Sequence, residues 1–317
     1  MNDKSEQKNE HVFGPVPSRR LGRSLGIDLV PHKTCTYDCL YCQVGRTTQK
    51  TTARKSWVPI DEIISELKSK LSTNPDYITL SGSGEPTLCS DCGRLIEKIK
   101  QITDIPVAVI TNGSLLFDRQ VRGELLGADV VMPSLDAGDE ETFKKINRPV
   151  PQITFDKMLQ GLIDFRREFK GKYWLEVFLV VGLNDSVEQI EKIAACIEKI
   201  RPDKVQLNTV SRPPAENVKA VSRERLRQIA EEIYKNAEVI ADFRGGEKTG
   251  GLKGKTDDIV EMLKRRPCSA EDIAAGLKMP LAEVSKSIEQ LIKSGRIESV
   301  EQNGKIYYKK VYESAAD

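Results

Sequence analysis

The sequence predicts an α/β protein: a partial (β/α)6 TIM-like barrel of parallel strands, followed by a small C-terminal winged-helix domain. Three observations lead to this prediction. From about residue 24 to 243, short β-branched runs alternate with amphipathic stretches in about six βα units. A glycine-rich segment, 243–251, then interrupts the alternation. Beyond it, three short helical patterns precede two strand-like runs. We therefore expect a disordered tail over 1–12, a core domain over 13–243, a linker over 244–255 and the second domain over 256–317.

The core strands are predicted where β-branched and apolar residues run together. They are Ser24–Val30, Tyr77–Ser81, Val107–Thr111, Val130–Leu135, Trp174–Val181 and Val205–Val210. The intervening segments carry apolar residues at helical spacing. They are Pro59–Leu71, Cys92–Ile102, Arg119–Leu126, Glu140–Ile146, Phe155–Phe169, Ser186–Ile200 and Arg223–Asn236. Six units suit a barrel that is open on one side, with ligands at the C-terminal ends of the strands.

The C-terminal pattern is that of a winged helix. Its helices are predicted at Thr256–Arg266, Ser269–Leu277 and Leu281–Ser294, and its wing at Arg296–Val300 and Lys305–Val311, with a turn at Asn303-Gly304. The third helix, which would be the recognition helix, balances its lysines with glutamates. Because phosphate binding depends on an excess of positive charge, this helix favours a protein, peptide or intramolecular partner over DNA.

Composition places the chain among ordinary globular proteins. It has 317 residues, of which 39% are hydrophobic and 30% charged. No apolar run approaches the roughly 18–20 residues that span a bilayer, and the first ten residues are polar. We expect a cytoplasmic protein without a membrane partner, whose seven cysteines are reduced thiols or metal ligands. The segment from residue 11 to residue 60 contains eight basic and two acidic residues, and this excess of positive charge favours an anionic substrate.

Three cysteines, Cys35, Cys39 and Cys42, form the most informative motif. Their spacing fits a loop that wraps a [4Fe–4S] cube and ligates three of its four irons, which leaves one iron open to a small molecule. His32 precedes the first cysteine by three positions, so a zinc site with three cysteines and one histidine is the alternative. The spacing alone favours the cluster.

A second motif follows the strand at 77–81. It reads Gly82-Ser83-Gly84-Glu85-Pro86. Glycines there allow close approach of the backbone to a ligand, and the carboxylate of Glu85 is an acceptor for an amino group. Its place one βα unit after the cysteine loop makes the pair of motifs far more specific than either alone.

Together these motifs resemble those of the radical S-adenosylmethionine (SAM) superfamily, over roughly residues 20 to 240. The resemblance implies that the three cysteines hold the [4Fe–4S] cluster and that SAM occupies the open iron. It also implies SAM contacts from Tyr41, Gly82, Ser83, Gly84, Glu85, Asn112, Ser134 and Asp136. The segment 181–185 resembles the region that supports the adenine. A serine between the two glycines departs from the family's usual pattern.

The resemblance further implies a radical SAM enzyme. One electron from the reduced cluster cleaves SAM into methionine and a 5′-deoxyadenosyl radical, which takes a hydrogen atom from the substrate. An external one-electron donor, flavodoxin or ferredoxin, is then required. The segment 13–31 resembles a small prokaryotic group related to the enzymes that make the wyosine base of transfer RNA.

Several alternatives stay open at this point. The substrate is either a tRNA or other RNA base, or a peptide, protein or metabolite. A remote alternative is a zinc-binding winged-helix transcription regulator. Cys89 and Cys92 are interpreted as structural thiols, with a redox pair or auxiliary ligands as the other possibility. Arg148 and Arg212 lie on loops and are candidates to hold an anionic substrate, and solvated surface arginines are the equal alternative.

Overall fold

A single eight-stranded sheet forms the core of the computed structural model, which describes residues 11–241, 256–277, 279–302 and 304–311. Its strand order is β1-β2-β5-β6-β7-β8-β9-β10. The strands are β1 (Val12–Ser18), β2 (Gly22–Ile27), β5 (Tyr77–Leu80), β6 (Val107–Thr111), β7 (Val130–Pro133), β8 (Lys172–Leu179), β9 (Lys204–Thr209) and β10 (Ala237–Val239). Every pairing from β2 to β10 is parallel, and β1 is antiparallel to β2. The predicted α/β fold with a parallel sheet is confirmed.

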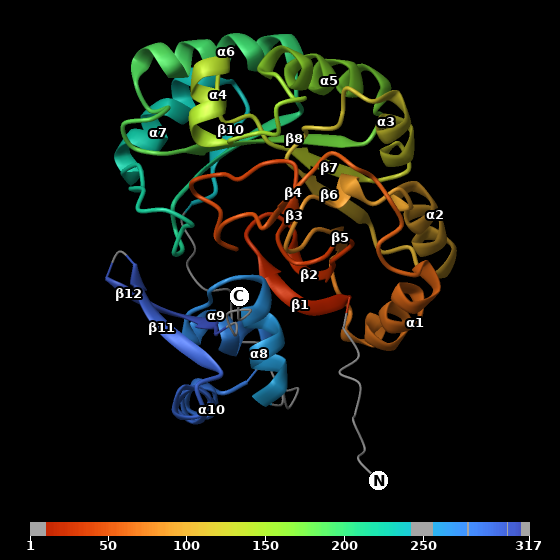
Figure 1. The fold of residues 1–317 in the computed structure, drawn as a ribbon, viewed down its shortest axis with the longest axis vertical. Helices are drawn as coiled ribbons and strands as arrows, with labels where there is room; N and C mark the ends of the chain where they lie inside the picture. Colours follow the sequence, from red (N-terminus) through yellow and green to blue (C-terminus); the bar gives the residue numbers. More distant parts are fainter. Residues whose placement is uncertain (1–10, 242–255, 278, 303, 312–317) are drawn as a thin grey trace.

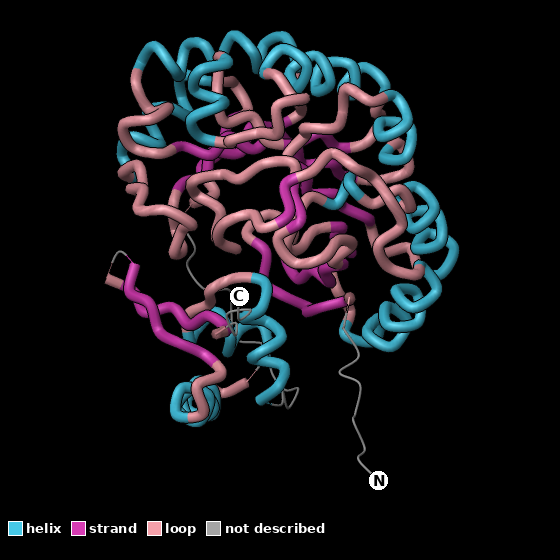
Figure 2. Tube along the Cα trace, viewed as in Figure 1, coloured by secondary structure: helices cyan, strands magenta, loops and turns pink. Residues whose placement is uncertain are grey.

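Helices cover the outer face of this sheet as an arc, and loops fill its concave side (Figures 1 and 2). They are α1 (Ile60–Lys70), α2 (Cys92–Ile102), α3 (Arg119–Leu125), α4 (Glu140–Ile146), α5 (Phe155–Glu168), α6 (Val187–Ile200) and α7 (Arg223–Ile233). The main hydrophobic core lies between helices and sheet. Strand β8 shows the alternation that builds it: Leu175 and Val177 enter this core, whereas Glu176 and Phe178 point to the concave side. No helix in the described ranges combines the length and apolarity needed to cross a bilayer.

Two strands of the eight-stranded sheet, β1 and β10, were not predicted. Strand β1 contains Pro15 and Pro17, which argue against a strand, but it lies at the edge of the sheet, where a missing N–H is tolerated. It begins at Val12, which is fully buried and which the sequence analysis had assigned to the tail. Strand β10 has only three residues and follows α7, where the sequence predicted a helix continuing to Asn236.

The open side of the sheet is bridged by side chains from the turn between β1 and β2. Arg19 donates from Nη1 to the carbonyl oxygens of Ile240 (3.1 Å) and Ala241 (3.4 Å), just beyond β10. The neighbouring Arg20 forms an ion pair with Glu176 of β8. We call the gap between the two edge strands the seam. Side chains rather than a backbone ladder therefore join its two sides.

The C-terminal residues form three helices and a hairpin beside β1 (Figure 1). These elements are α8 (Thr256–Arg265), α9 (Ala270–Leu277), α10 (Leu281–Lys293), β11 (Ile297–Gln302) and β12 (Lys305–Lys310). They have a hydrophobic core of their own, against which Val16 of β1 packs. The predicted helices and strands are present, whereas their assignment to a winged helix stays a prediction. The predicted linker 244–255 lies outside the described residues.

Candidate functional site

The three cysteines of the motif lie on the long loop that follows β2. Two short parallel strands, β3 (Thr34–Cys35) and β4 (Gln49–Lys50), close the base of this loop. Its middle is held on the end of α4, because the amides of Asp38 and Leu40 donate to the carbonyls of Asn147 and Ile146, each at 3.0 Å. All three cysteine residues are half-buried. We call residues 35–42 the cysteine loop.

Each of the three sulfurs accepts a hydrogen bond from a different nitrogen. The amides of Asn112 and Asn147 donate from Nδ2 to the Sγ atoms of Cys35 and Cys39, both at 3.5 Å. Lys33 approaches Sγ of Cys42 with its Nζ at 3.6 Å. Hydrogen bonds of this kind stabilise cysteine thiolates and tune the clusters that they ligate. Three separate elements therefore supply one donor to each sulfur.

The loop from Gly82 to Glu85, which follows β5, packs directly on the start of the cysteine loop. The amide of Lys33 donates to the carbonyl of Ser83 (2.9 Å), and the amide of Glu85 to that of Thr34 (3.0 Å). A Cβ at Gly84 would overlap the Thr34 carbonyl, and one at Gly82 would overlap the carboxyl of Asp28. The two glycines thus allow close contact with Asp28 and Thr34, and the predicted contact of this loop with a ligand stays a prediction.

The carboxylate of Glu85 is buried and joins two strand ends. Its Oε1 accepts from the amide of Thr87 (3.1 Å) and from the hydroxyls of Thr87 and Thr111 (2.6 Å each), and its Oε2 accepts from the amide of Asn112 (2.7 Å). Burial raises the pKa of Glu85, although these four donors act against that rise. Glu85 therefore holds Asn112 beside Cys35, and its contact with an amino group of SAM stays a prediction.

Asp136 is the centre of a second buried group. Its Oδ2 accepts from the Tyr41 hydroxyl and from Nδ2 of Asn147 (2.7 Å), and its Oδ1 accepts from the amide of Phe178 (3.0 Å). Burial raises the pKa of Asp136 to about 6. The Tyr41 ring stacks on that of Phe178, with centroids 3.8 Å apart. Of the described atoms, none hydrogen bonds to the buried Oδ1 of Asn147.

A third polar group lies on the concave side of the sheet. Glu176 pairs with Arg20 and accepts from Nδ2 of Asn208 at 2.8 Å, and Ser134 forms a β-bridge with it. Burial opposes ionisation of Glu176, but Arg20 and Asn208 outweigh it, so its pKa lies below the ordinary value. This carboxylate is therefore charged and held by two donors.

The structure gathers the predicted site residues along neighbouring strand ends. The cysteine loop follows β2, Gly82–Glu85 follows β5, Asn112 follows β6, and Ser134 and Asp136 follow β7. These positions agree with the expected edge of a parallel sheet. Which of the residues contacts SAM stays a prediction.

Sequence reasoning missed Lys33 and Asn147 as partners of the sulfurs, and Glu176 on the concave side. Glu176 carried a signal, because it is the only charged residue of the predicted strand Trp174–Val181. The only signal for Asn147 in the sequence was its position on a loop. Arg148, a predicted anion-binding residue, instead forms an ion pair with Glu216.

The other cysteines are placed apart from the cysteine loop. Cys89 is buried three residues before α2 and Cys92 is buried as its first residue, where its Sγ donates to the carbonyl of Pro86 at 3.2 Å. Cys196 is buried on α6 and Cys268 before α9. In the ranges that the structure describes, no three histidine, cysteine, aspartate or glutamate side chains form a group that could hold a single metal ion. This holds for Cys35, Cys39 and Cys42 as well, so it does not separate the zinc alternative with His32 from the cluster.

Comparisons with known proteins point to one family. The family model described as the radical SAM superfamily matches residues 29–197. A protein of Brachyspira hyodysenteriae named GTPase Obg is 46% identical over 96% of this chain, but the chain spans only 46% of that relative's length. The UPF0026 protein MJ1312 of Methanocaldococcus jannaschii is 35% identical over 94% of this chain and 95% of its own.

A solved structure of TYW1 with a bound lysine–pyruvate adduct has a similar fold. Its TM-score is 0.53 at 18% identity, over 71% of this chain and 76% of that one. At this identity the similarity shows the fold alone. With the match over residues 29–197 and the similarity to MJ1312 along nearly its whole length, the chain belongs to the radical SAM superfamily and, within it, with the UPF0026 proteins.

Proposed function

We propose that this protein is a radical SAM enzyme in which Cys35, Cys39 and Cys42 hold a [4Fe–4S] cluster. One observation carries the proposal: three thiols of a single loop each accept a nitrogen donor at the C-terminal ends of the sheet strands. The remaining cysteines are buried elsewhere, so this loop offers three ligands for four irons. Such a donor set fits a cluster with one iron available to SAM.

The chain's residues would position SAM in three ways. The buried Asn147 Oδ1 is an acceptor beside Cys39 and Asp136, and suits the amino group of SAM. Tyr41 is fixed by its bond to Asp136 and its stack on Phe178, and would offer an aromatic surface to adenine. The loop at Gly82–Glu85 keeps the cysteine loop in place through two backbone bonds.

When bound, the cluster and SAM supply the hard chemistry: one electron cleaves the sulfonium C–S bond to methionine and a 5′-deoxyadenosyl radical, which takes a hydrogen atom from the substrate. The electron comes from a flavodoxin or ferredoxin. The protein's own part is to hold these groups on the concave side of the sheet and to limit access of water. We place this activity in the cytoplasm.

Anaerobic reconstitution tests this proposal. The wild-type chain should bind iron and acid-labile sulfide in equal amounts and, with dithionite and SAM, release 5′-deoxyadenosine. Cys39→Ala should lose both, because one of three ligands is missing. Cys196→Ala, which removes a buried thiol of α6, should keep both. A Cys39→Ala protein that retains the cluster and SAM cleavage would overturn the proposal. Bound zinc without acid-labile sulfide in the wild type would instead favour the zinc-binding transcription regulator.

A further inference from the structure

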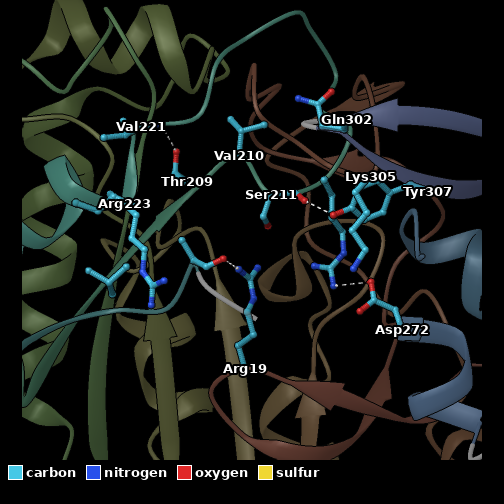
Figure 3. Close-up of a pocket in the computed structure, with 14 residues that line it drawn as sticks. Arg19, Thr209, Val210, Ser211, Val221, Arg223, Asp272, Gln302, Lys305 and Tyr307 are labelled. Atoms are coloured by element: carbon cyan, nitrogen blue, oxygen red, sulfur yellow. Dashed lines mark hydrogen bonds and ion pairs between the residues drawn. The ribbon is translucent and has the colours of Figure 1, made fainter. Parts of the chain in front are cut away.

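A cleft of about 310 Å³ lies between the open side of the barrel and the C-terminal hairpin. Core residues at the ends of β9 and β10 form one wall, and residues of α9, β11 and β12 form the other. In Figure 3, Arg19 and Arg223 lie on the core side and Asp272, Lys305 and Tyr307 on the C-terminal side. Tyr307 spans the two walls, because its hydroxyl donates to the Ser211 carbonyl at 2.7 Å.

The cleft is strongly basic. Four cationic side chains line it, and the lining holds one carboxylate, that of Asp272; the four are Arg19, Arg212, Arg223 and Lys305. Lys305 also lies 3.8 Å from the carboxylate of Glu271, which is outside the lining. Arg212 lies 3.6 Å from Asp272, and its buried Nε has no hydrogen-bond partner in the described part of the chain. The pKa of Arg19 is lowered to about 10, by burial and by nearby arginines. Cations crowded in this way are stabilised by an anion between them.

Two chains of contacts connect the cleft with the site of the proposed reaction. Arg212 approaches Oε1 of Gln43 at 3.5 Å, and Gln43 directly follows the cluster ligand Cys42. Arg19 donates to Oδ1 of Asn208 at 3.3 Å, and Asn208 in turn donates to Glu176. An anion in the cleft would therefore lie beside the cysteine loop and at the edge of the concave side.

We propose that the cleft holds a phosphate group of the substrate while the part to be modified reaches the concave side of the sheet. This inference rests on the proposed function for its second half only, since binding in the cleft is measurable without turnover. Three arginines on the core wall, opposite Lys305 on the C-terminal wall, favour phosphate, because their planar guanidinium groups bind its oxygens in pairs. A volume near the lower end of ligand pockets leaves room for a nucleotide-sized group. The phosphate belongs to a free nucleotide or to an RNA chain.

Calorimetric titration of the reconstituted full-length protein tests the cleft. The probes are inorganic pyrophosphate, guanosine monophosphate and total tRNA. Lys305→Gln should weaken pyrophosphate binding about tenfold, since a charge-assisted contact is lost, and Arg212→Gln should weaken it more. Lys309→Gln is the matched control. It removes the same charge from the same strand, and Lys309 pairs with Glu298 outside the cleft. Arg212→Lys distinguishes loss of the charge from loss of the fold, because it keeps a positive charge and should retain part of the affinity for pyrophosphate.

The probes also identify the source of the phosphate. Saturable binding of the mononucleotide with no added affinity for tRNA would indicate a small phosphorylated substrate. Tighter, salt-sensitive binding of tRNA, with a salt slope reduced by about 0.7 in Lys305→Gln, would indicate RNA. Equal pyrophosphate affinity in wild type, Lys305→Gln and Arg212→Gln overturns the inference.

The two proposals fail separately. Release of 5′-deoxyadenosine by a wild type that binds none of the three probes would reject the phosphate cleft and leave the radical chemistry standing. Cleft-dependent pyrophosphate binding by a wild type that neither assembles a cluster nor cleaves SAM would reject the proposed function and leave the anion site standing.

Discussion

At the scale of single residues, the arrangement of nitrogen donors distinguishes this site from an ordinary cysteine cluster. Asn112 reaches Cys35 from the end of β6, and Asn147 reaches Cys39 from the end of α4. Both amides have a second acceptor: Asn112 donates also to Thr36 and Asn147 to Asp136. Each amide is thus fixed by a partner other than the sulfur, so that its direction does not depend on the cluster.

The donors to sulfur should raise the reduction potential of the cluster, because they stabilise the extra negative charge of its reduced form. Removing one by Asn112→Ala should make the potential more negative, by on the order of 50 mV for a bond worth about 1 kcal/mol. Redox titration followed by electron paramagnetic resonance measures the shift. Asn236→Ala, which removes an exposed amide bonded to the Asp203 carbonyl, should leave the potential unchanged. An unchanged potential in Asn112→Ala would show that its amide does not act on the cluster.

At the scale of elements, the loop from Gly82 to Glu85 and the start of the cysteine loop are hydrogen-bonded to each other through their backbones. The cysteine spacing and the Gly-Ser-Gly-Glu run were both readable in the sequence, and their neighbouring positions follow from the parallel order of β2 and β5. Their direct contact was not readable, because it depends on which way Gly84 faces. In the structure the side of Gly84 where another residue would carry its Cβ lies against the carbonyl of Thr34, one residue before Cys35.

Gly84→Ala should therefore displace the cysteine loop. The added methyl group meets backbone that cannot move cheaply, at a cost of about 1–3 kcal/mol of unfolding free energy, and cluster content should fall with it. Gly123→Ala is the control: Gly123 lies exposed in α3 with open space around its Cβ position, so alanine should stabilise the protein by about 0.5–1 kcal/mol. Urea denaturation and iron analysis measure both effects. Full cluster content in Gly84→Ala at wild-type stability would refute this explanation.

How far the fold could be predicted differs from element to element. The six βα units were predicted because their helices and strands are periodic and strongly apolar. Strand β1 was missed because its prolines are compatible only with an edge position, which a single strand's sequence does not reveal. Strand β10 was missed because its pairing with β9, rather than its own three residues, makes it a strand. Glu176 and Asn147 were missed for the same reason, since their roles arise from partners that are distant in the sequence.

At the scale of the whole molecule, the C-terminal elements contact the barrel through polar and apolar side chains. The Tyr307 hydroxyl donates to Ser211, Arg212 faces Asp272, and Val16 of β1 packs against the C-terminal core. The residues of the two polar contacts line the basic cleft. The position of the hairpin relative to β9 therefore sets the width of that cleft.

Tyr307→Phe should loosen this docking without unfolding either part. It removes one hydrogen bond, which contributes about 1 kcal/mol, and should speed hydrogen exchange in β12 and around Ser211. Tyr308→Phe removes the hydroxyl of the neighbouring ring, which packs against the C-terminal core, and should leave exchange around Ser211 unchanged. Mass spectrometry of peptic fragments resolves the two regions. Identical exchange in both variants would mean that the Tyr307 hydroxyl contributes nothing to docking.

The seam has a consequence for how this barrel would respond to its ligand. The same guanidinium of Arg19 that donates to the carbonyls of Ile240 and Ala241 also lines the basic cleft. An anion in the cleft and the edge of β10 then compete for one set of N–H groups. By thermodynamic reciprocity, stronger hydrogen bonds across the seam weaken anion binding in the cleft, and a bound anion weakens the hydrogen bonds across the seam. Substrate binding in the cleft and opening of the barrel at the seam would then be coupled, so that each shifts the equilibrium of the other.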